Sequence, residues 1–338
     1  MSLFRAERRR LFKRRFTRWM LVVGVLLLGA VAASAFASNH KTTPEVRAAA
    51  QREADEQYAQ NVRFSEQYKR ECETAKSSGT SGAERFPDDC EVIQPPPREY
   101  FTADNYMPPT FTFRTSFPET ITVFTMLVAL VGFLIGASYV GAEWTSGGMM
   151  NLLIWRPRRL QVLFTKLGTL LAGMFSVSVV LGAAWTAGFW AIAVYRGSTE
   201  RMTPGVWRSL ALTGTRGIGL ILVMTALGFA LASIGRHTAI ALGIAGGVAL
   251  VGQLGLGFAL ASAGVAFWER WLLPTYLEAW MEKSVRLQDY RVCVASPGGG
   301  CEPSTLLVTW QHAGLVFAGM LVLVIGVATW LMRRRDVT

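Results

Sequence analysis

The sequence predicts an all-α polytopic membrane protein with six transmembrane helices, and three observations lead to this fold class. Hydrophobic residues make up 51% of the chain and charged residues only 17%, below the quarter that is usual in soluble domains. Apolar runs recur along the chain, each long enough to cross a hydrocarbon core of about 30 Å. Successive spans cross the membrane in opposite directions, and the excess of Lys and Arg lies in the termini and loops that then fall on one side.

This charge distribution predicts the orientation. Segments 1–18, 141–166, 235–237 and 333–338 carry formal charges of +7, +3, +1 and +2, together +13, which exceeds the net charge of +11. Because cytoplasmic loops are enriched in Lys and Arg, we expect both termini in the cytoplasm and a multi-pass protein in the cell membrane. The positive charge therefore indicates orientation, and no nucleic-acid partner is expected.

The expected elements follow from the alternation of apolar and polar runs. In order they are an amphipathic interfacial helix over 1–18, a first span over 19–38, an extracellular domain over 39–117, a second span over 118–140, a cytoplasmic hairpin over 141–166, a third span over 163–195, an outer loop over 196–216, a fourth span over 217–234, a fifth over 238–266, an extracellular amphipathic loop over 267–305, a sixth span over 306–332 and a cytoplasmic tail over 333–338.

The first two of these elements each have an alternative. Residues 1–18 place Phe4, Leu11, Phe12 and Phe16 near one helical face, which is typical of a helix in the headgroup layer, although a disordered basic tail fits the charge as well. The first apolar run ends in Ala35-Phe36-Ala37, so a cleaved signal peptide is the alternative to a retained span. The length of the run favours the span.

The first outer loop is predicted to be large and stapled by a disulfide. Thr42–Lys76 reads as a long charged helix, because Thr43-Pro44 is a typical helix start and no breaker follows for some thirty residues. Cys72, Cys90, Cys293 and Cys301 all fall in segments expected outside, where disulfides persist. Among three connectivities we favour the local pairs Cys72–Cys90 and Cys293–Cys301. Free or buried thiols are the alternative.

Four further features outside the hairpin bear on packing, membrane insertion or movement. Gly243 and Gly247 in the fifth span have the spacing that allows helix backbones to approach closely. Gln253, near the middle of that span, fits an interhelical hydrogen bond better than a contact with cargo. The stretch 208–216 has the character of a half-inserted segment, since it contains charges at membrane depth. The Trp-rich stretch 268–290 is expected to lie on the outer leaflet or to act as a lid.

Sequence motifs for catalysis are missing from the chain. It contains no GxxxxGK[ST], HExxH or GxSxG, and its three histidines are far apart in loops or near span ends. We therefore expect no enzymatic activity, no catalytic residue, no metal site and no cofactor in this chain.

The polar hairpin between the second and third spans is the best candidate site. Glu143 ends the second span, Gly147-Gly148 breaks the helix, and Met149–Trp155 can form a short helix along the membrane surface. Arg156-Pro157-Arg158-Arg159 turns the chain back, and Lys166 begins the third span. A carboxylate opposed by several cations can hold such a hairpin rigid. An ordinary solvated loop is the alternative.

These residues resemble the permease subunits of type-2 ABC exporters, especially those of actinobacteria. The resemblance rests on Glu143, Gly147, the Trp-x-Pro-Arg-Arg run from Trp155, Lys166, the N-terminal Glu7-to-Leu11 run and the six spans, so it covers the full length. The family usually has Thr where this chain has Gly148, and often a basic residue at Thr145. These departures concern the contacts of the hairpin more than the assignment.

The resemblance implies an export permease without enzymatic activity of its own. A cytoplasmic ABC ATPase dimer would supply ATP and Mg, a second permease copy or a paralogue would complete the pathway along spans two and five, and the lipid membrane would surround it. The hairpin would be the coupling helix, and the residues expected to dock the ATPase are Glu143, Gly147, Gly148, Asn151, Leu152, Arg156, Pro157, Arg158, Arg159 and Lys166. The cargo would be hydrophobic or amphipathic. The alternative is a membrane sensor or scaffold whose outer domain binds a ligand.

Overall fold

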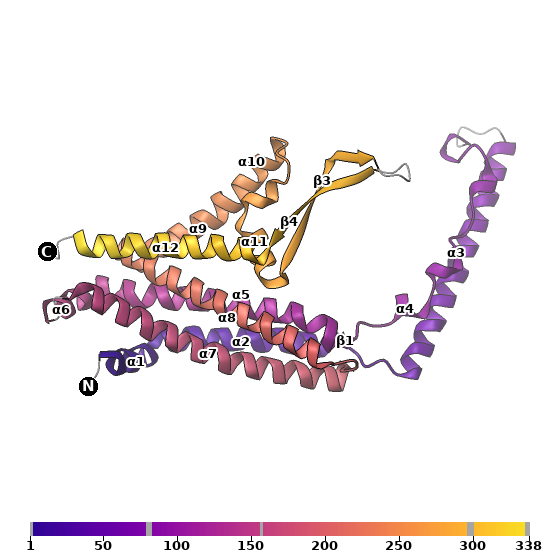
Figure 1. Ribbon diagram of the computed structural model, residues 1–338. Helices are drawn as coiled ribbons and strands as arrows, with labels where there is room; N and C mark the ends of the chain where they lie inside the picture. The colour runs from indigo at the N-terminus through magenta and orange to yellow at the C-terminus, as the bar shows by residue number, and fades with distance from the viewer. Residues whose placement is uncertain (1–2, 79–82, 156–157, 296–300, 335–338) are drawn as a thin grey trace. The chain divides into compact units, whose positions relative to one another are not determined.

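The computed structural model describes residues 3–78, 83–155, 158–295 and 301–334 (Figure 1). Six helical segments in these ranges are long and apolar enough to cross a membrane, which confirms the predicted number of spans. They are α2 (Arg15–Ser38), α5 (Phe113–Thr145), α7 (Arg159–Arg196), α8 (Pro204–Gly235), a composite span over Thr238–Ser262 and α12 (Trp310–Arg334). The chain divides into two compact units, one of residues 1–33, 114–189 and 201–338, the other of 34–113 and 190–200.

The core of the first unit lies where α5 meets α8. In an apolar 18-residue stretch of each of these two helices, 61% and 56% of the residues are buried. The corresponding share is 11% in α2 and α12 and 6% in the composite span. The backbones approach closely: a Cβ on Gly136 would lie 2.3 Å from the carbonyl oxygen of Thr225, and one on Gly228 would lie 2.3 Å from that of Phe133. Only glycine fits at such a contact, as is common between membrane helices.

The glycines predicted to pack tightly are elsewhere. Gly243 and Gly247 lie on the composite span, and a Cβ on either would meet nothing within 4 Å among the atoms described. The span consists of α9 (Thr238–Gly247), a π-helical stretch (Val248–Gly255) and α10 (Leu256–Ser262). Within the described chain, Gly243 and Gly247 therefore make no close helix contact, whereas Gly136 and Gly228 do.

A short helix, α11 (Leu273–Glu282), is held at both ends by polar groups from two spans. Gln253 Oε1 accepts a hydrogen bond from the backbone N–H of Leu273 at 2.7 Å, which is the interhelical role expected for this amide. At the other end, the Arg216 guanidinium donates to the carbonyls of Trp280 and Met281, both at 3.3 Å. These side chains satisfy backbone groups that a helix leaves unpaired at its termini.

The prediction of a half-inserted segment before the fourth span is wrong. Helix α8 begins at Pro204, with Thr203 Oγ1 accepting the N–H of Val206, and continues without a break through Arg216 to Gly235. The polar stretch at its start lowers the hydropathy, but a Thr cap and a proline in the first turn are a regular helix start. The charge of Arg216 is compensated by the end of α11.

The segment 267–305 is not a single amphipathic loop, and the chain is not purely helical. After a 3₁₀ turn (Trp268–Trp271) and α11, strands β3 (Ser284–Ala295) and β4 (Cys301–Thr309) form an antiparallel hairpin in which Ser284 pairs with Thr309. The sixth span therefore begins at Trp310 rather than at 306. The apolar stretch from 306 to 309 suits either a helix or a strand, and pairing with β3 decides for the strand.

The second unit is built on α3 (Pro44–Ser77), in agreement with the predicted long helix. Thr43 caps it, since its Oγ1 accepts the N–H of Val46 at 3.3 Å. The smaller elements are 3₁₀ turns over Ala83–Arg85, Cys90–Val92 and Arg98–Tyr100, helix α4 (Ala103–Tyr106), and strands β1 (Phe111–Thr112) and β2 (Gly197–Ser198), which pair in parallel.

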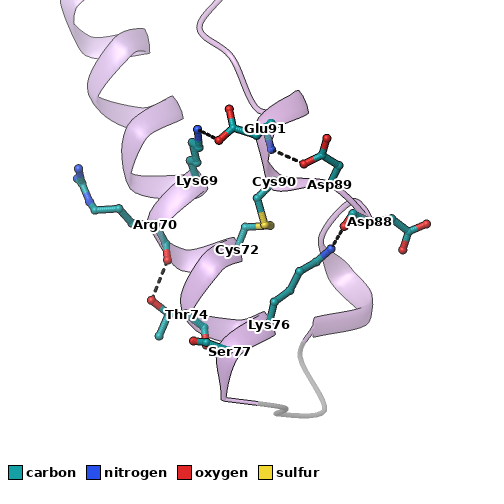
Figure 2. Close-up of a disulfide and its surroundings, with 10 residues drawn as sticks. All are labelled: Lys69, Arg70, Cys72, Thr74, Lys76, Ser77, Asp88, Asp89, Cys90 and Glu91. Carbon is teal, nitrogen blue, oxygen red and sulfur yellow. Dashed lines mark hydrogen bonds and ion pairs between the residues drawn. A yellow bond between two sulfur atoms is a disulfide. The ribbon is translucent and has the colours of Figure 1, made fainter.

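A disulfide between Cys72 and Cys90 fastens the end of α3 to the loop that follows, as predicted (Figure 2). The two residues are separated by 18 positions, so the bridge is expected to stabilise the unit by about 3 kcal/mol. Figure 2 shows two further ties, from Lys69 Nζ to Glu91 Oε1 at 2.8 Å and from Lys76 Nζ to the carbonyl of Asp88. The side chains of the other predicted pair, Cys293 and Cys301, lie outside the described residues.

Three of the four segments predicted to be cytoplasmic meet at one end of the first unit. Helix α1 (Leu3–Lys13) contacts the C-terminal end of α5, where Arg10 Nη1 lies 3.5 Å from Glu143 Oε1. At the same end the guanidinium of Arg236, from the turn between α8 and α9, lies 4.8 Å from the ring centroid of Trp144. This common placement agrees with the alternation on which the topology was predicted. The helix at residues 3–13 is confirmed, and its position at a membrane surface stays a prediction.

Candidate functional site

Two carboxylates share one buried lysine at the base of the hairpin. Lys166 Nζ lies 2.8 Å from Glu7 Oε2 and 2.8 Å from Glu143 Oε2, and the lysine side chain is fully buried. Glu7 comes from α1, Glu143 from α5 and Lys166 from α7, so a single ammonium joins three helices. The contact with Glu7 is also a hydrogen bond, whereas the contact with Glu143 is an ion pair without hydrogen-bond geometry.

Tyr139 completes the buried part of the site. One turn before Glu143 on α5, its hydroxyl donates to Glu7 Oε2 at 2.5 Å, and its ring lies 5.2 Å from Lys166 Nζ. Glu7 thus accepts from both an ammonium and a hydroxyl. Burial alone would raise the pKa of the Glu7 carboxyl, but the charge and hydrogen bonds of Lys166 and Tyr139 outweigh it and hold that pKa below its ordinary value.

Two partly exposed arginines contact the remaining oxygen of Glu143. Arg10 Nη1 lies 3.5 Å from Glu143 Oε1, and Arg14 Nη2 lies 3.8 Å from the same oxygen. Arg14 also donates to the carbonyls of Tyr139 and Ser138, at 2.7 and 3.2 Å. With three cations facing two carboxylates, the network of Glu7, Arg10, Arg14, Tyr139, Glu143 and Lys166 compensates its buried negative charges. We call these six residues the hairpin-root network.

The local sequence explains why these groups meet. Glu7 and Leu11 are four residues apart on α1, so they lie on one face, and both are almost fully buried. A Cβ on Gly173 of α7 would lie 2.9 Å from Leu11 Cδ2, so the missing side chain lets α1 sit against α7. Tyr139 and Glu143 have the same four-residue spacing on α5 and present both groups to α1.

The hairpin itself extends beyond this network. Gly147 has φ of +70°, a left-handed conformation that ends α5 and suits glycine. The chain then forms α6 (Gly148–Trp155). In its first turn the Asn151 N–H donates to the Gly147 carbonyl. Met149 is buried against the rest of the unit, while Ile154 is 76% exposed. The short helix therefore has a supported face and a free apolar one.

The residues predicted to dock an ATPase divide into two groups. Glu143 and Lys166 are buried, so they hold the hairpin and offer no surface to a partner. The others lie nearer the surface: Asn151 and Arg158 are exposed, Gly147, Gly148, Leu152 and Arg159 are half-buried, and Arg156 and Pro157 fall outside the described residues. The cations that the structure brings to Glu143 are Lys166, Arg10 and Arg14.

Sequence reasoning missed Glu7 and Tyr139 as site residues. Glu7 is the one acidic residue among eight Lys and Arg in residues 1–18, and it shares a helical face with Leu11. A carboxylate on the apolar side of a basic helix indicates a buried cation partner, because an unpaired charge is costly there. Tyr139 carries no such signal, apart from its position one turn before Glu143.

A comparison with protein families agrees with this architecture. A family model described as "ABC-2 family transporter protein" matches residues 9–337. The match covers the hairpin, Glu143, Lys166 and the six spans, and begins two residues after Glu7. The chain belongs to this ABC-2 family. No curated protein and no solved structure matches it.

The chain is thus an ABC-2 type permease, the transmembrane component of an ABC transporter. Its six spans make it a multi-pass membrane protein. Components of this kind are not themselves catalytic, and membership implies an ATPase partner. In this ABC-2 permease the hairpin-root network lies where the second and third spans meet the connecting helix α6, and it ties both to α1.

Proposed function

We propose that this permease exports a hydrophobic or amphipathic cargo, driven by ATP and Mg bound to a separate cytoplasmic ATPase dimer, and that α6 is the coupling helix on which the ATPase docks. The proposal rests on family membership together with the form of the hairpin. Both termini and the hairpin are cytoplasmic in this account, and the disulfide-bonded unit is outside.

The observation that carries the proposal is an exposed apolar helix on a rigid base. Ile154 is 76% exposed and Asn151 is also open, although α6 itself is only eight residues long. Where α5 leads into α6, Lys166 binds Glu7 and Glu143 at 2.8 Å each. A force on α6 would therefore reach α5, α7 and α1 together, because separating a buried ion pair would leave its charges uncompensated.

A second copy of the chain, or a paralogue, completes the transporter in this account. Only 6% of the residues in the apolar 18-residue stretch of the fifth span are buried within the single chain, and Gly243 and Gly247 on it face open space. A second permease packed along this span would cover it, and spans two and five would line the pathway.

Copurification with the ATPase tests the docking role of α6. Ile154→Glu should reduce ATPase recovery by roughly 30-fold, because a central apolar contact is worth about 2 kcal/mol and a buried charge adds to the loss. Expression should stay near wild type, since an exposed position tolerates substitution. The matched control is Val92→Glu in the second unit, at an aliphatic side chain that is 69% exposed. Full ATPase recovery with Ile154→Glu, or an equal loss with Val92→Glu, would remove α6 as the docking element.

A further inference from the structure

The exposed surface of α1 carries positive charge without any acidic residue to balance it. Glu7 is the one acidic residue among residues 1–18, and it is buried in the hairpin-root network against Lys166. Arg5, Arg8 and Arg9 are all exposed. Their guanidinium groups make no hydrogen bond or ion pair in the part of the chain that the structure describes. The helix therefore offers three uncompensated cations to a partner outside the chain.

The spacing of these arginines places them together on one face of the helix. Arg8 and Arg9 follow Arg5 by three and four positions, so the three side chains are neighbours on the helix surface. Glu7 and Leu11 form the opposite, buried face, which packs against the spans. Like charges at this spacing repel one another and weaken an isolated helix. An anionic partner that contacts all three arginines would remove that repulsion.

The contacts of α1 place it beside the spans rather than beyond their ends. Glu7 binds Lys166, and a Cβ on Gly173 would lie 2.9 Å from Leu11 Cδ2. Lys166 and Gly173 are seven residues apart on α7, so α1 lies against about 10 Å of this span. Helix α7 has 38 residues and a length of about 57 Å, which exceeds the 40–45 Å of a bilayer with its headgroups. Because Lys166 is the eighth residue of α7, α1 lies at the level of the headgroups.

Exposed aromatic rings beside the arginines favour a lipid surface over an acidic protein as the partner. Phe4, Phe12 and Phe16 are exposed, and Trp19 at the start of the first span is 66% exposed. Only residue 14 separates α1 from α2, so the apolar surface of the span continues onto α1. Cations next to aromatic rings at the end of a span are typical of the membrane interface, where the rings reach the acyl boundary and the charges meet the headgroups.

We propose that Arg5, Arg8 and Arg9 bind the headgroups of anionic phospholipids in the leaflet where α2 begins, and that this binding holds α1 against the hairpin-root network. Guanidinium groups form paired hydrogen bonds with phosphate oxygens. A zwitterionic lipid has the phosphate too, but its own cation opposes the arginines, so the net charge of the lipid decides. Each cation close to an anionic surface increases binding about fivefold. The proposal concerns α1 alone and does not depend on the docking role of α6.

Native mass spectrometry of the full-length permease tests the lipid preference. The protein is reconstituted in nanodiscs of equal amounts of phosphatidylglycerol and phosphatidylcholine with the same acyl chains, released into detergent, and its retained lipids are counted. Wild type should retain mainly phosphatidylglycerol. A triple variant with Arg5→Gln, Arg8→Gln and Arg9→Gln should lower the ratio of the two retained lipids at least fivefold. The corresponding triple Lys variant should keep most of the preference, because it keeps the charge.

A charge-matched control changes three exposed arginines of the second unit, Arg52, Arg63 and Arg85, to Gln and should keep the wild-type ratio. The proposal would be overturned by a wild-type ratio in the folded triple Gln variant of α1, or by an equal loss in the control. An unchanged ratio together with lost ATPase copurification would assign this face of α1 to the ATPase instead.

The melting temperature of wild type gives a second test that needs no variant. A ligand that binds only the folded protein stabilises it, so wild type should melt at a higher temperature in phosphatidylglycerol nanodiscs than in phosphatidylcholine nanodiscs. The difference should shrink at 1 M salt, where the Debye length is about 3 Å. Equal melting temperatures in the two lipids at low salt would show that anionic headgroups do not hold α1.

Discussion

Lys166→Met should largely abolish the folded arrangement of α1, α5 and α7. The ammonium of Lys166 is the shared partner of Glu7 and Glu143, and all three side chains are almost completely buried. Removing one partner of a buried ion pair leaves an uncompensated charge, which costs on the order of 3–5 kcal/mol. Here one substitution would leave two buried carboxylates, Glu7 and Glu143, without their shared lysine partner. That loss is a large share of the 5–15 kcal/mol that stabilises a typical protein.

Thermal denaturation of the detergent-purified protein measures this effect. Lys13→Met is the matched control, because Lys13 is an exposed residue of α1 outside the network. Its melting temperature should equal that of wild type. Adding Glu7→Gln and Glu143→Gln to Lys166→Met removes the stranded charges and should restore much of the stability, since neutral groups can replace a buried ionic cluster. Equal melting temperatures for Lys166→Met and Lys13→Met would show that the network does not stabilise the fold.

Gly136→Ala should be the second severe change, although it adds only one methyl group. The new Cβ would lie 2.3 Å from the Thr225 carbonyl oxygen, a backbone atom of α8 that cannot rotate away. The two central helices would have to separate, at a cost of about 1–3 kcal/mol or more for overpacking. Gly132→Ala should be milder, because the atom that its Cβ would meet is the Thr225 side-chain hydroxyl.

Expression level and melting temperature report on this contact. Gly168→Ala on α7 is the control, because a Cβ there meets nothing within 4 Å. We expect it to be neutral. A graded series, with Gly168→Ala like wild type, Gly132→Ala intermediate and Gly136→Ala lowest, supports the tight α5–α8 contact. Gly136→Ala with wild-type expression and stability would contradict it.

The sequence was most informative where a local pattern decides the structure. Six spans follow from apolar length alone, the start of α3 from Thr43-Pro44, and the end of α5 from Gly147. The Cys72–Cys90 bridge is local as well, closing a loop of 18 positions. Each of these features depends on residues close together in the chain, so composition and spacing are enough.

Features that depend on distant residues could not be predicted in the same way. Glu7 and Lys166 are 159 positions apart, and the excess charge around Glu7 was interpreted as a sign of orientation only. The glycine spacing noted at Gly243 and Gly247 also occurs at Gly132 and Gly136, and the sequence does not say which pair meets a neighbouring helix. Similarly, the start of the sixth span was misplaced because β3, not local propensity, makes residues 306–309 a strand.

The central claim is that α6, standing on the hairpin-root network, is the element through which the ATPase moves the spans. Site-specific photocrosslinking in the intact complex tests it most directly. A photoreactive residue at Ile154 should form an adduct with the ATPase subunit, and one at Val92 in the second unit should not. An ATPase adduct from position 92, or none from position 154 in a complex that copurifies with its ATPase, would contradict the claim.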